Sequence, residues 1–118
     1  MESVKDMAFK EKSKIRAKVI TFYCILLKRN LEFPLCLANC EKLIEIYKDD
    51  ETYAWKYLVK ANCLIGKLYI LLNSLEHCMK YLNLARAIID RNIQDKESRY
   101  HADIFYVYGF SYWKFFKQ

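Results

Sequence analysis

The sequence predicts an all-α fold of about five helices arranged as antiparallel hairpins, and three observations support this prediction. Only two glycines and one proline occur among 118 residues, so few points can break a helix. Apolar residues recur at intervals of three and four, the spacing of one helix face. No stretch alternates polar and apolar residues as a half-buried strand does. We expect residues 1–118 to form a single domain.

The first helix is predicted from about residue 5 to residue 29, because its apolar residues follow the helical period with lysines between them. The residues that set this period are Ile15, Val19, Phe22 and Leu26. Residues 1–12 are rich in charge, and we expect them to form a disordered basic leader.

The second helix is predicted from 34 to about 48. Pro34 disfavours helical geometry at Phe33 and suits the first turn of a new helix. The residues expected on its one apolar face are Cys36, Cys40, Leu43 and Tyr47.

The third and fourth helices are predicted from about 53 to 72 and from 75 to about 91. Asp50 or Thr52 can cap the third helix, and Ser74 can cap the fourth. The third is expected to turn inward Ala61, Ile65, Leu68 and Leu72. The fourth repeats the period through Leu75, Cys78, Leu82, Ala85 and Ile89.

The fifth helix, predicted from about 99 to 117 with Ser98 as its cap, carries two aromatic stripes. One face, expected to pack on the preceding hairpin, holds Ile104, Phe105, Tyr108, Tyr112, Phe115 and Phe116. The second stripe consists of Tyr106, Phe110 and Trp113. A surface helix needs one apolar stripe, so the second indicates an interface. A bound partner, self-association, a further helix of a longer parent protein, or burial by this chain alone could each cover it.

Charge and cysteine content narrow the classes of function. The net charge is +6, and residues 1–29 carry eight cations against three acids. This excess suits an acidic partner or a nucleic acid backbone, and equally a solvated helix face. The five cysteines are odd in number and lack the Cys-x-x-Cys spacing, so we expect small buried side chains, with no disulfide framework, metal or cofactor. His77 and His101 are expected at the surface or its boundary.

The sequence does not predict an enzyme or a membrane protein. It has no glycine-rich phosphate loop, no Gly-x-Ser-x-Gly elbow and no His-Glu-x-x-His helix. The N-terminus lacks the apolar core of a secretory signal, so an intracellular location, in cytoplasm or nucleus, is expected. Charged residues interrupt every apolar segment before it reaches the length of a membrane span.

An internal repeat links the two glycines, which lie 43 residues apart in IGKLY and YGFSY. The middle of the chain resembles the tetratricopeptide-repeat (TPR) superfamily, whose pattern positions hold Ile65, Gly66, Tyr69, Cys78, Leu82 and Ala85. Tyr108, Gly109 and Tyr112 restart the pattern, and both glycines are expected at close contacts between helices. The sequence departs from the family pattern at Asn62 and Asp90.

The resemblance implies a right-handed array of stacked hairpins whose first helices line a concave groove. The groove positions carried over from the family are Lys18, Thr21, Ile25, Lys28, Lys60, Cys63, Lys67, Ile70, Tyr106, Phe110 and Trp113. The family's carboxylate clamp is not reproduced, because Cys63 and Lys67 stand where it is expected.

A non-catalytic protein interaction domain, an adaptor or assembly subunit, is therefore the expected function. Lysines beside aromatic side chains suit a protein or peptide segment that is acidic and carries apolar anchors. The residues expected to bind it are Lys18, Lys28, Lys60, Lys67, Ile70, Tyr106, Phe110 and Trp113. The alternatives are a nucleic acid binder that uses the basic first helix and a self-associating structural subunit.

Overall fold

The computed structural model describes residues 3–93 and 99–116, and in these the chain forms five α-helices. They are α1 (Val4–Arg29), α2 (Phe33–Tyr47), α3 (Glu51–Leu71), α4 (Leu75–Asn92) and α5 (Arg99–Phe116). The predicted all-α class and the five helices are confirmed. Ser98, the predicted cap of the fifth helix, lies outside the described residues.

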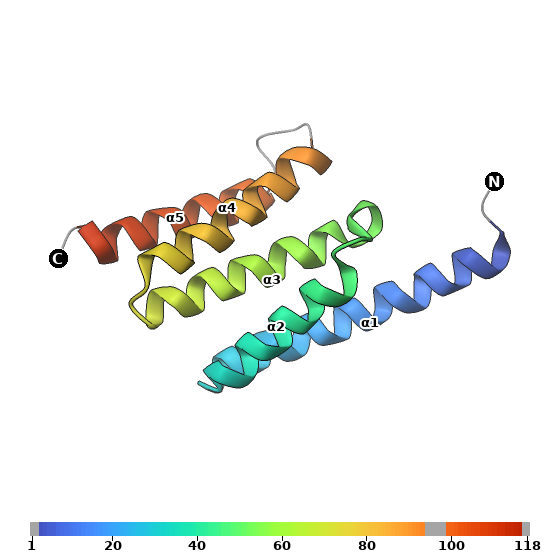
Figure 1. The fold of residues 1–118 in the computed structure, drawn as a ribbon, viewed down its shortest axis with the longest axis horizontal. Coiled ribbons are helices and arrows are strands. Elements are labelled where there is room, and N and C mark those ends of the chain that lie inside the picture. The colour runs from blue at the N-terminus through green and yellow to red at the C-terminus, as the bar shows by residue number, and fades with distance from the viewer. Residues whose placement is uncertain (1–2, 94–98, 117–118) are drawn as a thin grey trace.

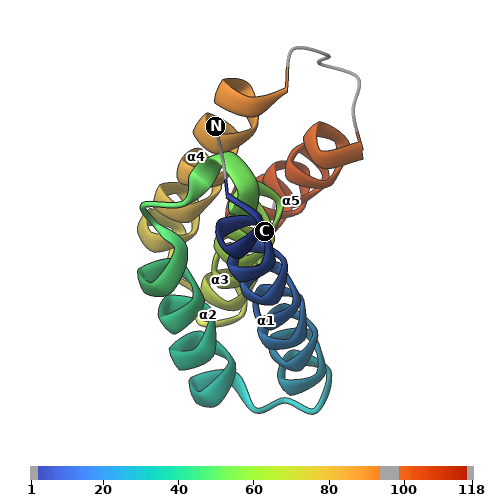
Figure 2. The ribbon, with the colours of Figure 1, turned by 90° about the vertical axis from the view of Figure 1, so that its right-hand side faces the viewer.

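The helices form two layers with α3 between them. Successive helices run antiparallel and contact one another (Figure 1). Figure 2 shows α2 and α4 on one side of α3 and α1 and α5 on the other. Because α3 contacts all four other helices, it forms the centre of the core. One long side of α3 faces the space between α1 and α5 (Figure 2).

The predicted inward faces of α2 and α4 are confirmed almost completely. Cys36, Cys40, Leu43 and Tyr47 are buried in α2, and Cys78, Leu82, Ala85 and Ile89 are buried in α4. In α3 the prediction fails at one position, Leu72. This residue follows the last helical residue and is 55% exposed. The helix ends before the period can bring its side chain inward.

The apolar stripe predicted for α1 is not the face that packs. Ala17, Cys24 and Leu27 are the buried residues of α1. Ile15, Val19, Phe22 and Leu26 are exposed. The helix α1 already begins at Val4, so most of the segment predicted to be a disordered leader is helical. The first turns of α1 project beyond the other helices (Figure 1). Small side chains let α1 approach its neighbours closely and leave the larger ones outside.

The helix α5 is rotated relative to the prediction. Its buried residues are His101, Ile104, Val107 and Ser111, although His101 was expected at the surface or its boundary and Val107 and Ser111 belong to neither predicted stripe. Three members of the stripe expected to pack inward are exposed: Phe105, Tyr112 and Phe116. Buried His101 is held by Asp90, whose Oδ1 lies 3.2 Å from Nε2.

The two glycines occupy different environments, which corrects half of the predicted pattern. A Cβ on Gly66 would lie 3.0 Å from Leu82 Cδ2 and 3.6 Å from the Cys78 carbonyl oxygen, so α3 and α4 meet closely at this glycine. A Cβ on Gly109 would meet nothing within 4 Å. The prediction of a close contact is confirmed at Gly66 and is wrong at Gly109.

The helices α1 and α3 end in the same type of turn. Leu31 and Asn73 adopt left-handed backbone conformations, with φ of 62° and 64°. Glu32 N donates to Leu27 O and Ser74 N donates to Tyr69 O, each over 2.9 Å. This arrangement is the Schellman motif, which satisfies the last carbonyls of a helix. The chain therefore repeats one helix-turn geometry after α1 and after α3.

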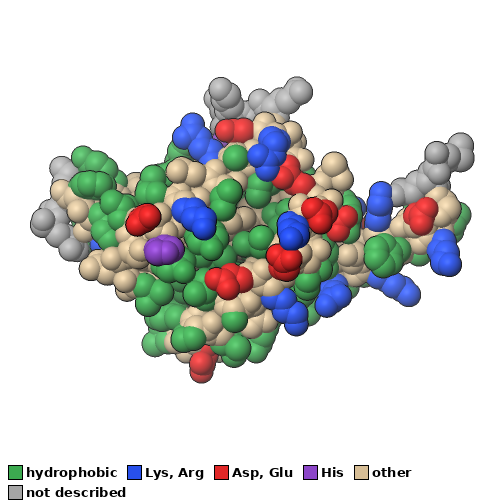
Figure 3. All heavy atoms as spheres, viewed as in Figure 1, with side chains coloured by type: hydrophobic (Ala, Val, Ile, Leu, Met, Phe, Trp, Pro, Cys, Tyr) green, Lys and Arg blue, Asp and Glu red, His purple; other side chains and the backbone are tan. Residues whose placement is uncertain are grey.

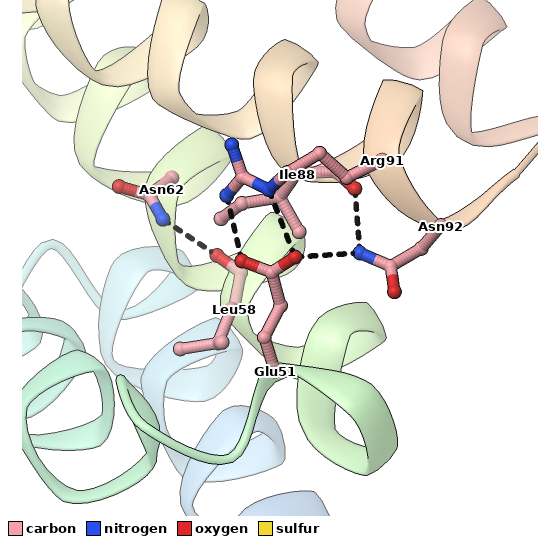
Figure 4. A network of polar contacts seen from close by, with 6 residues as sticks. All are labelled: Glu51, Leu58, Asn62, Ile88, Arg91 and Asn92. Carbon is pink, nitrogen blue, oxygen red and sulfur yellow. Dashed lines mark hydrogen bonds and ion pairs between the residues drawn. The ribbon is translucent and has the colours of Figure 1, made fainter.

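A polar network joins the start of α3 to the end of α4 (Figure 4). Arg91 donates to both carboxylate oxygens of Glu51, over 2.6 and 3.0 Å, and Asn92 Nδ2 donates to Glu51 Oε2 over 2.8 Å. The bond from Arg91 lowers the pKa of the Glu51 carboxyl, and the amide of Asn92 acts in the same direction. The charged form of Glu51 therefore stabilises this end of the hairpin.

We expect Glu51→Gln to lower the free energy of unfolding by about 1 kcal/mol at neutral pH, since it replaces the carboxylate that accepts both bonds from Arg91 by an uncharged amide. Because the pKa of Glu51 is depressed in the folded state, its stabilisation is present above the ordinary value of 4.5 and is lost as pH falls below it. Urea unfolding curves of both proteins should converge in acid. A constant difference across that range would contradict this assignment.

Candidate functional site

The side of α3 between α1 and α5 is hollowed by a pocket of about 450 Å³, which we call the basic pocket. All three helices contribute to its walls. The described residues that line it are Thr21, Lys56, Tyr57, Val59, Lys60, Cys63, Lys67, Arg99, Tyr100, Asp103 and Val107. Four of these carry a positive charge and one carries a negative charge, so this part of the surface attracts anions.

A second pocket of about 300 Å³, the aromatic pocket, adjoins the first. The two share Lys67 and Val107. The described residues lining the aromatic pocket are Lys28, Lys67, Ile70, Leu71, Tyr106, Val107 and Phe110. We call the two pockets together the α3 groove, because both follow the length of α3.

Lys67 stands where the two pockets meet. Burial lowers the pKa of its ammonium group, and the nearby charges of Lys60 and Lys28 lower that pKa further. Cys63 and Asp103 act in the opposite direction. The lowered pKa means that the charge of Lys67 is costly to hold in this groove, and an anionic ligand would relieve that cost.

An aromatic cluster supports the mouth of the basic pocket. The rings of Trp55 and Tyr100 meet edge to face with centroids 5.1 Å apart. The guanidinium of Arg99 lies over the Tyr100 ring and its Nη2 donates to the Tyr100 hydroxyl over 3.1 Å, while Lys56 lies over the Trp55 ring. Cation–π contacts of this kind limit the conformations of long basic side chains, so these cations are partly held in place before a ligand arrives.

Six of the eight residues predicted to bind a partner line the α3 groove: Lys28, Lys60, Lys67, Ile70, Tyr106 and Phe110. Thr21 and Cys63, which the resemblance also implied, line the basic pocket. Lys18 and Trp113 are exposed and line neither pocket. The structure therefore brings most of the predicted set together and leaves these two outside it.

Two cations of the basic pocket, Lys56 and Arg99, were missed by the sequence prediction. Lys56 lies one turn before Lys60, on the stripe that continues through Cys63 and Lys67. Arg99 and Asp103 extend the Tyr106 stripe of α5 toward its start in the same way. Extending each predicted stripe by a turn would have found them.

The side of the molecule opposite the α3 groove carries a mixture of both charges (Figure 3). Figure 3 shows acidic and basic side chains interspersed over the face formed by α2, α3 and α4. His77 of α4 stacks on Tyr69 with ring centroids 4.7 Å apart, and its Nδ1 shares a hydrogen bond with Ser74 Oγ over 2.8 Å. These contacts fix the turn between α3 and α4, with Ser74 at the predicted cap position.

The cysteines are packed as core residues. All five are buried and none forms a disulfide. Burial raises the pKa of Cys63 and of Cys78 to about 11, so both are neutral thiols at pH 7. Within residues 3–93 and 99–116, no three His, Cys, Asp or Glu side chains are grouped so that they could hold a metal ion.

We expect Lys67→Met to stabilise the protein by about 0.5 to 1 kcal/mol at neutral pH, because it removes a charge that burial and two other lysines disfavour. Since the folded pKa of Lys67 is depressed, its charge weakens the fold at neutral pH, and this penalty disappears as pH rises toward the ordinary value of 10.5. The increase in the thermal unfolding midpoint of the Lys67→Met variant should therefore shrink as pH rises toward that value. Lys18→Met, at an exposed position, is the matched control and should change little.

Compared with protein-family models, curated proteins and solved structures, the chain matches none of them. None of the described helices combines the length and hydrophobicity needed to cross a lipid bilayer.

Proposed function

We propose that this chain is a non-catalytic protein interaction domain that binds a segment of a partner protein in the α3 groove. One observation carries the proposal: cations and aromatic side chains from α1, α3 and α5 line two adjoining pockets on a single face. Arginine, tyrosine and phenylalanine are enriched where proteins bind one another. An acidic segment with an apolar anchor would place its carboxylates beside the cations and its anchor among the aromatic side chains.

We also propose that the five helices form a TPR-like right-handed stack. The close contact of Gly66 with Leu82 supports this, since both stand at positions of the family pattern. The matching turns at Leu31 and Asn73 support it as well, because a structural repeat places equal turns after equivalent helices. The exposed Gly109 marks the place where α5 departs from the pattern.

A protein segment suits the α3 groove better than a nucleic acid does. Sequence-independent binding of a single strand uses cations along the whole path of its backbone. The aromatic pocket offers mainly apolar and aromatic side chains, with Lys28 and Lys67 as its described cations. A peptide can place its charges at one end and its apolar side chains at the other.

A peptide library tests the proposal. Random 12-residue peptides displayed on phage are selected against the immobilised chain, and the enriched peptides are then measured in solution. We expect the enriched peptides to compete for one site. Their affinity for the Lys60→Glu variant should be at least tenfold lower than for the unchanged protein, whereas Lys18→Glu, on the exposed face of α1, should cause no such loss. Failure to enrich any peptide, or equal sensitivity to the two substitutions, would refute binding in the groove.

Self-association is a second candidate function, and the exposed apolar side chains of α1 and α5 favour it. Val19 and Phe22 on α1, and Tyr112 and Phe116 on α5, are each more than half exposed. Exposed apolar patches of this kind often mark interfaces. Light scattering coupled to size exclusion would show a monomer mass at all concentrations if these faces do not associate.

A further inference from the structure

Resting on the proposed function, we propose that the segment bound in the α3 groove is extended and ordered along its length. Its acidic side chains would lie together in the basic pocket, and one bulky apolar side chain would lie in the aromatic pocket. The order is set by the chemistry of the two pockets.

The lining changes character along α3. Lys56, Lys60 and Arg99 belong to the basic pocket alone, with the polar side chains of Thr21 and Tyr57 beside them. The residues that belong to the aromatic pocket alone are Lys28, Ile70, Leu71, Tyr106 and Phe110. A carboxylate gains most beside the group of cations, and an apolar side chain gains most where aliphatic and aromatic atoms replace water.

The geometry of α3 sets the spacing between the two parts of the ligand. Lys60 lies in the basic pocket and Ile70 in the aromatic pocket. An α-helix rises about 1.5 Å per residue, so these positions lie about 15 Å apart along α3. An extended peptide advances about 3.3 Å per residue and covers that distance in about four to five residues.

The size of the pockets favours an extended segment over a helix. The two cavities measure about 450 and 300 Å³. A helix with its side chains is about 10 to 12 Å across and meets a surface with a whole face, whereas cavities of this size accept individual side chains. Two adjoining pockets of different chemistry suit successive side chains carried by an extended backbone.

Two synthetic peptides of identical composition test the order. The segregated peptide, EEEEGSGSWL, places four glutamates and a tryptophan at the predicted spacing. The interleaved peptide, EGWESEGLES, has the same residues and the same charge. Because the protein is basic, general attraction acts on both peptides alike. Titration calorimetry at fixed ionic strength should show that the segregated peptide binds at least tenfold more tightly.

Double-mutant cycles then locate each half of the peptide. Lys60→Gln should couple to replacement of the peptide glutamates by glutamine, and Phe110→Ala should couple to replacement of its tryptophan by alanine. The two cross-combinations should be additive. Lys18→Gln and Phe116→Ala make the same chemical changes outside the groove and should show no coupling. Thermal unfolding of each variant establishes that the fold is retained.

The outcomes separate this inference from the proposed function. Equal affinity for the two peptides, coupling in the cross-combinations, or no binding of the segregated peptide would overturn the ordered arrangement. If library peptides nevertheless compete for the groove, the proposed function stands without it. Tight binding of a 12-nucleotide oligouridine that weakens steeply with added salt and competes with the segregated peptide would overturn both, in favour of nucleic acid.

Discussion

Tyr47→Ala is expected to lower the free energy of unfolding by about 4 kcal/mol, the largest effect of a single substitution that we predict. Tyr47 closes α2, and its side chain is 1% exposed. Its hydroxyl donates to the Ser13 carbonyl oxygen of α1 over 2.7 Å. Alanine would leave a cavity between the two helices and would remove the hydrogen bond to the Ser13 carbonyl oxygen. Urea unfolding followed by circular dichroism measures the loss.

Tyr47→Phe separates packing from hydrogen bonding. It keeps the ring and removes only the hydroxyl, so a loss of about 1 kcal/mol is expected. If the phenylalanine variant lost as much stability as the alanine variant, the hydrogen bond to Ser13 would dominate and the packing of the ring would contribute little. Amide exchange in α1 should increase in the alanine variant, because Tyr47 holds this helix against α2.

Gly66→Leu is expected to cost about 3 kcal/mol, because there is no space for a side chain between α3 and α4. Even a single methyl group at this position would lie 3.0 Å from Leu82. Leucine would push the two helices apart at this close contact. The gain in helix propensity, about 0.8 kcal/mol relative to glycine, is too small to offset this strain.

Gly109→Leu is the matched control for this prediction. A Cβ at Gly109 would meet nothing within 4 Å, so the gain in helix propensity should remain and stabilise α5 by about 0.5 to 1 kcal/mol. Thermal unfolding of the two variants should therefore shift in opposite directions. A shift in the same direction would mean that Gly109 also faces a close neighbour in solution.

The sequence predicted where the helices lie far better than which faces of α1 and α5 are buried. The inward faces of α2 and α4 were found because each has one apolar stripe. The helix α1 carries large apolar residues on its exposed side, such as Val19 and Phe22, and packs through Ala17 and Cys24. Counting large apolar side chains favours the wrong face wherever close helix packing selects small ones.

In α5 the prediction failed for a second reason, because a polar side chain is buried. Ser111 is buried and donates to the Tyr108 carbonyl oxygen over 2.8 Å, so a polar side chain faces the core once its hydrogen bond is made inside the helix.

Most of the groove residues could be predicted, because spacing along α3 and α5 determines which side chains share a face. Lys56 and Arg99 were missed because the sequence does not show how far the groove extends along α3 and α5. That extent depends on where the neighbouring helices begin.

The buried thiols between α1 and α2 give the molecule an internal reporter of its own opening. Cys36 Sγ donates to the Cys24 carbonyl oxygen over 3.3 Å, and Cys36 is fully buried. Burial also raises the pKa of this thiol, so the reactive thiolate is scarce in the closed state. An alkylating reagent can then modify Cys36 only when the first two helices separate. The rate of modification would measure how often that happens, with no cysteine introduced for the purpose.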